Sequence, residues 1–160
     1  MLAVIILLVL VLIVAMTRHN YDYKCFLLTT DNAKTRQERF MKHFNGATPL
    51  EVIHGPNTKN VKIAREYEDI VDPEYFEKAI EMHYDPLVKR PNITYFNLGA
   101  IGCFVGHMDF YRRCFEQGLK YAVIFEDNVI IKSPRLFDEI QKVIDEKGEN
   151  FEMCFFHCLS

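Results

Sequence analysis

The sequence has no tryptophan and no excess of basic residues over its 160 positions. Its 19 lysines and arginines are outnumbered by 22 acidic residues, which gives a formal net charge of −3. Because nucleic-acid-binding domains concentrate positive charge, we predict no nucleic-acid partner. The 13 phenylalanines and 8 tyrosines supply enough large apolar side chains to fill the core of one globular domain.

Cysteine is also scarce, and its number is odd. Most of the five cysteines stand in apolar segments, where a free cysteine behaves as a small hydrophobic residue. They are Cys25, Cys103, Cys114, Cys154 and Cys158. A dense disulfide framework is therefore not expected. The sequence also lacks internal repeats and low-complexity tracts.

The longest apolar run is at the N-terminus, where residues 2–16 carry no charge and the first charged side chain is Arg18. A membrane-spanning helix needs about 20 apolar residues, so this run is short but usable. We predict that residues 1–17 are a single-pass membrane anchor. A cleaved signal is the alternative, although a basic start and a clear cleavage site are missing. The sequon at Asn92 would be used only in a lumenal protein.

Strand and helix patterns alternate along the rest of the chain. Consecutive apolar residues are typical of strands buried on both faces of a parallel sheet. We predict strands over residues 24–30, 49–54, 121–125 and 151–156, and helices over 33–44, 72–82, 99–118 and 133–147. Asp31 or Asn32 is expected to cap the first helix, and Asn45-Gly46 to end it. The pattern predicts an α/β sandwich with a mostly parallel sheet.

Two motifs suggest chemistry. Gly99-Ala100-Ile101-Gly102-Cys103-Phe104-Val105-Gly106-His107 begins a helix, and Glu126-Asp127-Asn128 follows the strand over 121–125. Open α/β sheets bind ligands beyond the carboxyl ends of their strands, and hard cations prefer carboxylate and carbonyl oxygens. The acidic motif therefore predicts a divalent-metal and phosphate site. A polar strand end entering a turn is the simpler alternative.

These motifs resemble glycosyltransferase family 25, which includes lipooligosaccharide and collagen galactosyltransferases. The family pattern is G-E-I-G-C-x-x-S-H followed, after a helix and a strand, by E-D-D. The resemblance extends from about Lys24 to the C-terminus. The chain departs from the pattern at Ala100, Gly106 and Asn128, and the last change removes a charge from the expected metal site.

The resemblance implies a glycosyltransferase A-type, Rossmann-like sandwich preceded by an N-terminal hydrophobic helix. It also implies transfer of galactose or glucose from a UDP-sugar to a glycan or protein acceptor, as in lipopolysaccharide biosynthesis, with Mn²⁺ or Mg²⁺ as cofactor. The implied donor-site residues are Thr29, Thr30, Arg36, Gly55, Gly99, Gly102, His107 and Glu126, and the implied metal ligands are Asp127 and Asn128.

The same resemblance bears on the limits and the topology of the domain. The family-like domain is expected over residues 18–160 and to be C-terminally truncated, and no general base is assigned. Arg18 and Lys24 after the apolar run favour a cytoplasmic body, whereas Golgi-type relatives imply the lumenal body that we prefer. The alternative is a catalytically inactive family member that acts as a binding or adhesion module, or a truncated remnant.

Several candidate residues also have structural interpretations. Gly99 and Gly102 suit either close approach of a nucleotide or tight helix packing, and His54-Gly55 suits a plain turn. Arg36 suits either a nucleotide contact or a solvated helix face.

Cys103 and His107 share a helix face and could bind zinc. The chain offers no second pair at a fitting spacing, so we expect His107 to contact the donor or to be a hydrogen-bonded core residue. The opposite helix face is expected to be core. It comprises Ile101, Phe104, Val105, Met108 and Phe115.

Overall fold

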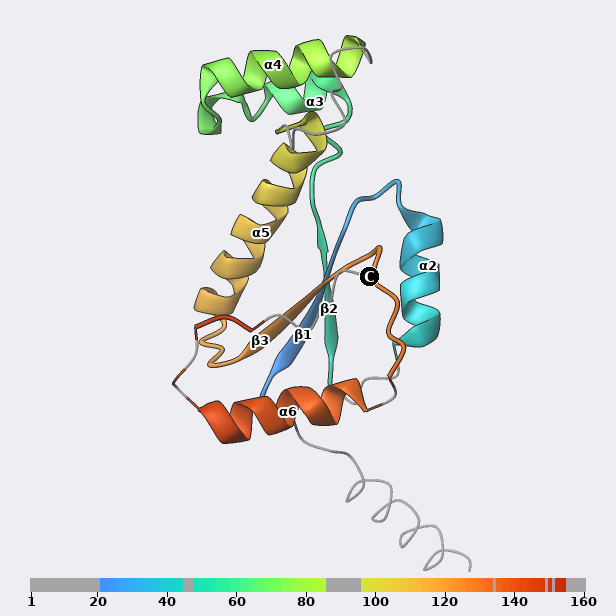
Figure 1. Ribbon diagram of the computed structural model, residues 1–160, viewed down its shortest axis with the longest axis vertical. Coiled ribbons are helices and arrows are strands. Elements are labelled where there is room, and N and C mark those ends of the chain that lie inside the picture. The colour runs from blue at the N-terminus through green and yellow to red at the C-terminus, as the bar shows by residue number, and fades with distance from the viewer. Residues whose placement is uncertain are drawn as a thin grey trace, which may run out of the picture.

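The computed structural model describes residues 21–44, 48–85, 96–133, 135–148, 150 and 152–154 (Figure 1). The apolar run over residues 2–16, Asn45-Gly46 and the sequon at Asn92 lie outside these residues. Within the described part of the chain, no helix combines the length and apolar character that a membrane crossing requires. The prediction of a single-pass, membrane-anchored protein is therefore not supported, and we correct it.

The centre of the molecule is a parallel sheet of three strands in the order β2-β1-β3. The strands are β1 (Lys24–Thr29), β2 (Leu50–His54) and β3 (Ala122–Glu126). The predicted α/β class and the first three predicted strands are confirmed. The fourth is wrong where it can be checked, because Glu152–Cys154 form no strand, while Phe151 and Phe156 lie outside the described residues.

Two helices, α2 (Lys34–His43) and α6 (Leu136–Lys147), cover one face of the sheet (Figure 1). Alternate side chains of β1, such as Cys25 and Leu27, point toward them and share a core with Phe40 and Phe137. The predicted cap of α2 is wrong: Ala33 occupies the cap position, and no side chain bonds there. The Asn32 carboxamide instead accepts a hydrogen bond from the Thr30 hydroxyl.

A long helix, α5 (Leu98–Glu116), covers the other face. The remaining side chains of β1, Phe26 and Leu28, pack there against Phe110 and Ile53. The helix ends where Gly118 adopts a positive φ of 61°, a backbone conformation that favours glycine. The predicted end of this helix near Gly118 is thus confirmed.

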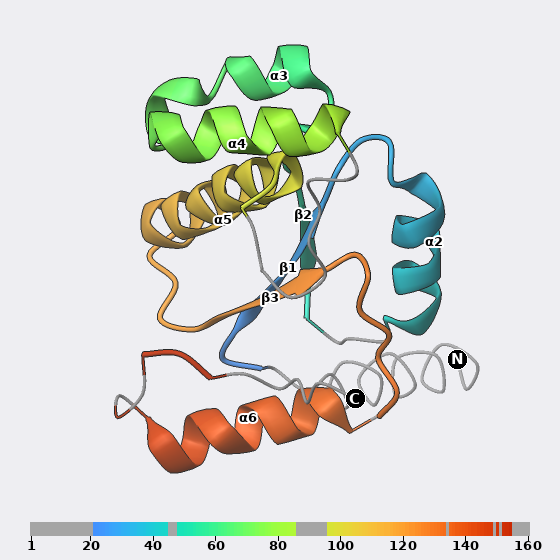
Figure 2. The ribbon, with the colours of Figure 1, turned by 45° about the horizontal axis from the view of Figure 1, so that its top comes forward.

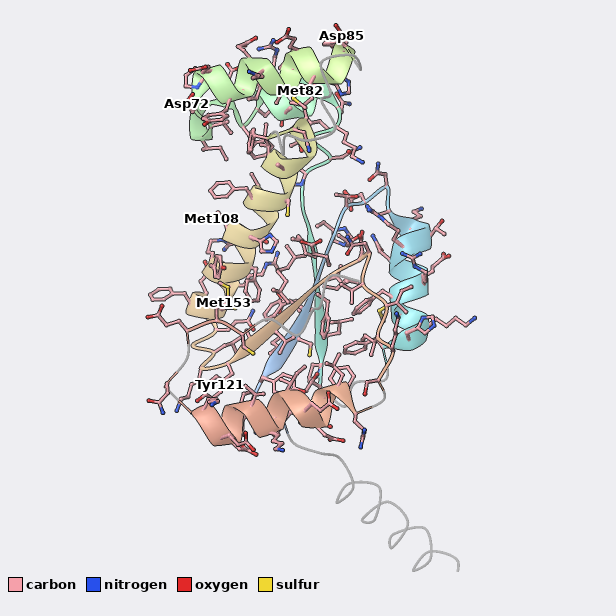
Figure 3. All side chains as sticks on the ribbon, in the orientation of Figure 1. Asp72, Met82, Asp85, Met108, Tyr121 and Met153 are labelled. Carbon is pink, nitrogen blue, oxygen red and sulfur yellow. The ribbon has the colours of Figure 1, made fainter. Side chains whose placement is uncertain are left out.

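A smaller layer of helices lies over the N-terminal end of α5 (Figure 2). It comprises α3 (Val61–Arg65), a 3₁₀ turn (Glu68–Ile70) and α4 (Pro73–Tyr84). Asp72 begins α4 by accepting hydrogen bonds from the amides of Glu74 and Tyr75, and Asp85 follows its other end (Figure 3). The sequence predicted α4 but not α3. Leu98 and Ile101 of α5 join this layer to the body of the molecule.

Candidate functional site

All three strands end at the same edge of the sheet. In register, Thr29 pairs with His54 on β2, and Leu28 pairs with Glu126 on β3. After β1 the chain enters α2 on one face of the sheet, whereas after β2 it passes through the α3–α4 layer and returns to the sheet through α5 on the opposite face. Adjacent strands whose connections diverge in this way open a crevice at their carboxyl ends, the usual ligand position in such sheets.

A groove of about 730 Å³ lies at this divergence. Its lining includes Asp31 after β1, His54 and Gly55 at the end of β2, and Gly106 and Asp109 on α5. The volume is in the range of small-ligand sites. Of the predicted donor-site residues, Gly55 lines the groove. Thr29 and Thr30 immediately precede Asp31, which also lines it.

Asp31 and His54 join the two sides of the groove. The His54 Nδ1 and a carboxylate oxygen of Asp31 are 2.7 Å apart. By sequence pattern alone, Asp31 is a candidate helix cap and His54 a turn residue. Their adjacency depends on the pairing of β1 with β2, so no local pattern could have revealed it.

Asp127 is buried at the end of β3 and is 5% exposed. Its Oδ2 accepts a 2.6 Å hydrogen bond from the Thr29 hydroxyl, and its Oδ1 lies 3.3 Å from Nε of Arg36. Its amide donates to the carbonyl of Leu28, which fixes the end of β3 beside β1. Three residues from three predicted elements, Thr29, Arg36 and Asp127, thus meet in the structure.

Glu126 points to the other face of the sheet. Its Oε1 lies 3.9 Å from Sγ of Cys103 on α5, and His107 Nδ1 lies 3.5 Å from the same sulfur. Neighbouring side chains of a strand point to opposite faces. Glu126 therefore lies on the α5 side of the sheet and Asp127 on the α2 side. Cys103 is exposed, but partial desolvation of its sulfur, followed by the nearby Glu126 charge, raises the pKa of the Cys103 thiol. Asn128 is exposed beyond the strand.

The glycines of the long-helix motif make close packing contacts. A Cβ on Gly102 would meet the Pro56 backbone and lie 2.7 Å from the Thr58 hydroxyl, and the Gly102 amide donates to that hydroxyl. The Ala100 amide donates to the side chain of Asn97, the cap of α5. The backbone amides of Ala100 and Gly102 therefore have hydrogen-bond partners within the protein. Of the two interpretations of Gly102, tight helix packing agrees with these contacts.

The comparison with protein-family models matches residues 23–157 to the model described as glycosyltransferase family 25 (LPS biosynthesis protein). The chain belongs to glycosyltransferase family 25. The matched residues include every strand and helix of the described structure, so the resemblance inferred from the two motifs is confirmed. No curated protein and no solved structure gives a significant match.

Proposed function

We propose that this family 25 glycosyltransferase transfers a hexose, galactose or glucose, from a UDP-sugar to a glycan or protein acceptor. The observation that carries the proposal is the junction of Thr29, Arg36 and Asp127 next to the groove at the strand ends. In this proposal the layered α/β body is the glycosyltransferase A-type arrangement, and the groove between β1 and β2 receives the nucleotide.

Arg36 is suited to contact the donor diphosphate. Its side chain is about half exposed, while its Nε is held by the buried carboxylate of Asp127. A guanidinium has five N–H donors in a planar fork, so the remaining donors can bind phosphate oxygens. Thr29 fixes the other side of the Asp127 carboxylate. The cluster therefore holds its positive group in place before the donor binds.

We place the divalent ion of this proposal at the side-chain oxygen atoms of Asp127 and Asn128. A carboxylate has about four acceptor positions, and the contacts to Thr29 and Arg36 use two of them. Mg²⁺ in phosphate-binding sites is held by one or two carboxylates, the phosphates and water. Mn²⁺ or Mg²⁺ at this place would stabilise the charge of the departing UDP. Thr30, Gly99 and Gly102 would support the donor pocket, with Glu126 and His107 on its α5 side.

A binding module without transfer activity is the second candidate. It is favoured by the pairing of Asp127 with Arg36, which balances the charge of the buried carboxylate, and by the neutral Asn128. Both features weaken the attraction of the site for a divalent ion.

Calorimetric titration of UDP into the 160-residue chain, with and without Mn²⁺, tests the donor site. We expect Mn²⁺-dependent binding that tightens about tenfold, or about 1.4 kcal/mol, in Asn128→Asp. Asn150→Asp adds the same charge at an exposed position after α6 and should bind like the unmodified protein. If both the unmodified protein and Asn128→Asp are folded and neither binds UDP, the donor-site assignment is overturned.

Release of UDP from UDP-galactose and UDP-glucose in the presence of acceptor glycans then separates the two functions. Turnover that falls in Asp127→Asn supports the transferase. Metal-dependent UDP binding without turnover would favour the binding module.

A further inference from the structure

Three side chains with different ligand atoms converge on the α5 face of the sheet. Cys103 and His107 stand one turn apart on α5, and Glu126 reaches them from the end of β3. The sulfur, an imidazole nitrogen and a carboxylate oxygen all lie within 4.8 Å of one another. The sequence showed the first two as an incomplete zinc pair, and the fold adds the third ligand.

The spacing matches a tetrahedral zinc centre. Zinc binds sulfur at about 2.3 Å and imidazole nitrogen at about 2.0–2.1 Å, so tetrahedral angles place the two ligands about 3.5 Å apart. The observed distance from Cys103 Sγ to His107 Nδ1 is 3.5 Å, and that from Sγ to Glu126 Oε1 is 3.9 Å. The imidazole nitrogen and the carboxylate oxygen lie within 4.8 Å of each other, so side-chain rotation at Glu126 would complete the set.

We propose that Cys103, His107 and Glu126 form a three-ligand zinc site whose fourth position is open to water or to a substrate oxygen. Thiolate and imidazole ligands favour Zn²⁺ over Mg²⁺ or Mn²⁺. Three protein ligands with one open position are the pattern of reactive zinc sites, whereas structural zinc is usually enclosed by four. Cys103 and Glu126 are exposed and His107 is half-buried, so an ion can reach them.

The hydrogen bonds around the site explain how it is held without an ion. His107 Nδ1 lies 2.9 Å from the Cys103 carbonyl oxygen, which fixes the ring over the same turn of α5. Zinc at Nδ1, the atom whose distance to the sulfur fits, would replace this bond. The thiolate and not the thiol binds zinc, so binding releases the Cys103 proton to solvent.

This site differs from the hard-ion position proposed for the donor. Asp127 and Asn128 offer oxygen atoms only, and Asp127 points toward α2, away from Cys103. Glu126 and His107 are common to the zinc site and the proposed donor pocket. Zinc binding is measured without nucleotide, so a failure of UDP binding and a failure of zinc binding are separate results.

The test is competition between a chromophoric chelator and the reduced, metal-free 160-residue chain for Zn²⁺. We expect one equivalent of tightly bound zinc, and Co²⁺ in its place should show a thiolate-to-cobalt charge-transfer band. Cys103→Ser should abolish the band, and His107→Gln or Glu126→Gln should weaken zinc binding about tenfold or more. Cys114→Ser, a half-buried thiol on the same helix, should leave both unchanged.

A second measurement needs no substitution. Bound zinc should slow alkylation of Cys103 but not of the exposed Cys154, as read by peptide mapping. The proposal is overturned if folded protein binds no zinc, or if binding survives Cys103→Ser and is lost in Cys154→Ser. That second pattern would assign the metal to the Cys154–Cys158 segment instead.

Discussion

At the scale of single residues, the two acidic side chains at the end of β3 point to opposite faces of the sheet. Asp127 is held by Thr29 and Arg36 on the α2 side, and Glu126 lies near Cys103 and His107 on the α5 side. The alternation of side chains along a strand separates them. Consecutive acidic residues in a sequence therefore need not share an ion.

Gly102 gives a prediction at this scale. A methyl group there would press against the Pro56 backbone, which cannot move as a flexible side chain can. We expect Gly102→Ala to lower the free energy of unfolding by about 1–3 kcal/mol, as measured by urea denaturation. Gly99→Ala is the control, because its new methyl would meet only side-chain atoms of Asn97 and Lys59. Equal losses in both variants would contradict the packing role.

At the scale of elements, α5 is more exposed than its sequence suggested. Ile101 is buried as expected, but Phe104, Met108 and Phe115 are exposed, so the predicted core stripe is wrong (Met108 is labelled in Figure 3). The face that packs on the sheet instead carries Gly106 and Phe110. Gly106 fits closely against Leu28, and a Cβ there would overlap that side chain. Small residues thus helped to select the packed face.

Two phenylalanines of α5 test this orientation. Phe110 is 7% exposed and stacks edge-on against Phe26, with ring centroids 5.2 Å apart, whereas Phe115 is 88% exposed. We expect Phe110→Ala to cost about 3–5 kcal/mol of stability, and Phe115→Ala to change it by less than about 0.5 kcal/mol. Chemical denaturation of both variants measures the difference. A reversed order would mean that the other face of α5 packs on the sheet.

A cluster of ion pairs joins β1, β2 and α5 near the C-terminal end of α5. Glu51 on β2 accepts hydrogen bonds from Lys24 on β1 and from Arg113 on α5. These contacts lower the pKa of Glu51 from 4.5 to about 2. Stability from this group is therefore present above about pH 4.5 and is lost as the pH falls through about 2.

The corresponding prediction compares the unmodified chain with Glu51→Gln by urea denaturation between pH 7 and pH 3. The variant should be about 1–2 kcal/mol less stable at pH 7, because partial exposure of the pair screens the interaction. The difference should shrink toward pH 3. Glu116→Gln removes a more exposed pair with Arg112 and should change stability by less than about 0.5 kcal/mol. A difference that stays constant with pH would contradict the assignment.

At the scale of the whole molecule, the described part has three apolar clusters. One cluster lies on each face of the sheet, and both contain side chains of β1. The third cluster joins α3 and α4 to the start of α5. Tyr23 strengthens the α6 side by donating from its hydroxyl to the Phe137 carbonyl. Local stability follows the density of such buried contacts, so the body and the α3–α4 layer should open separately.

Hydrogen exchange measured by mass spectrometry tests this division. Amides of β1 should exchange most slowly, because the strand is paired on both edges and covered on both faces. Amides of α4 should open at a free energy lower by about 1–2 kcal/mol, since its layer is attached mainly through Leu98 and Ile101. Equal protection of β1 and α4 would show one cooperative unit instead.

The sequence by itself determined the elements that have strong local signals. Apolar runs gave β1, β2 and β3, Asp72-Pro73 gave the start of α4, and the two motifs identified the family. It failed for α3, a helix of five residues with little periodicity, and for the packed face of α5. That face depends on which side chains of β1 it meets.

Only the tertiary structure decided which functional residues meet. Thr29 and Asp127 are 98 positions apart, and Cys103 and Glu126 are 23 apart, yet each pair is in contact. Parallel pairing of β1 with β3 and the placement of α5 bring them together. The sequence specifies the chemistry of each side chain, whereas the sheet order and the alternation of strand faces determine its partners.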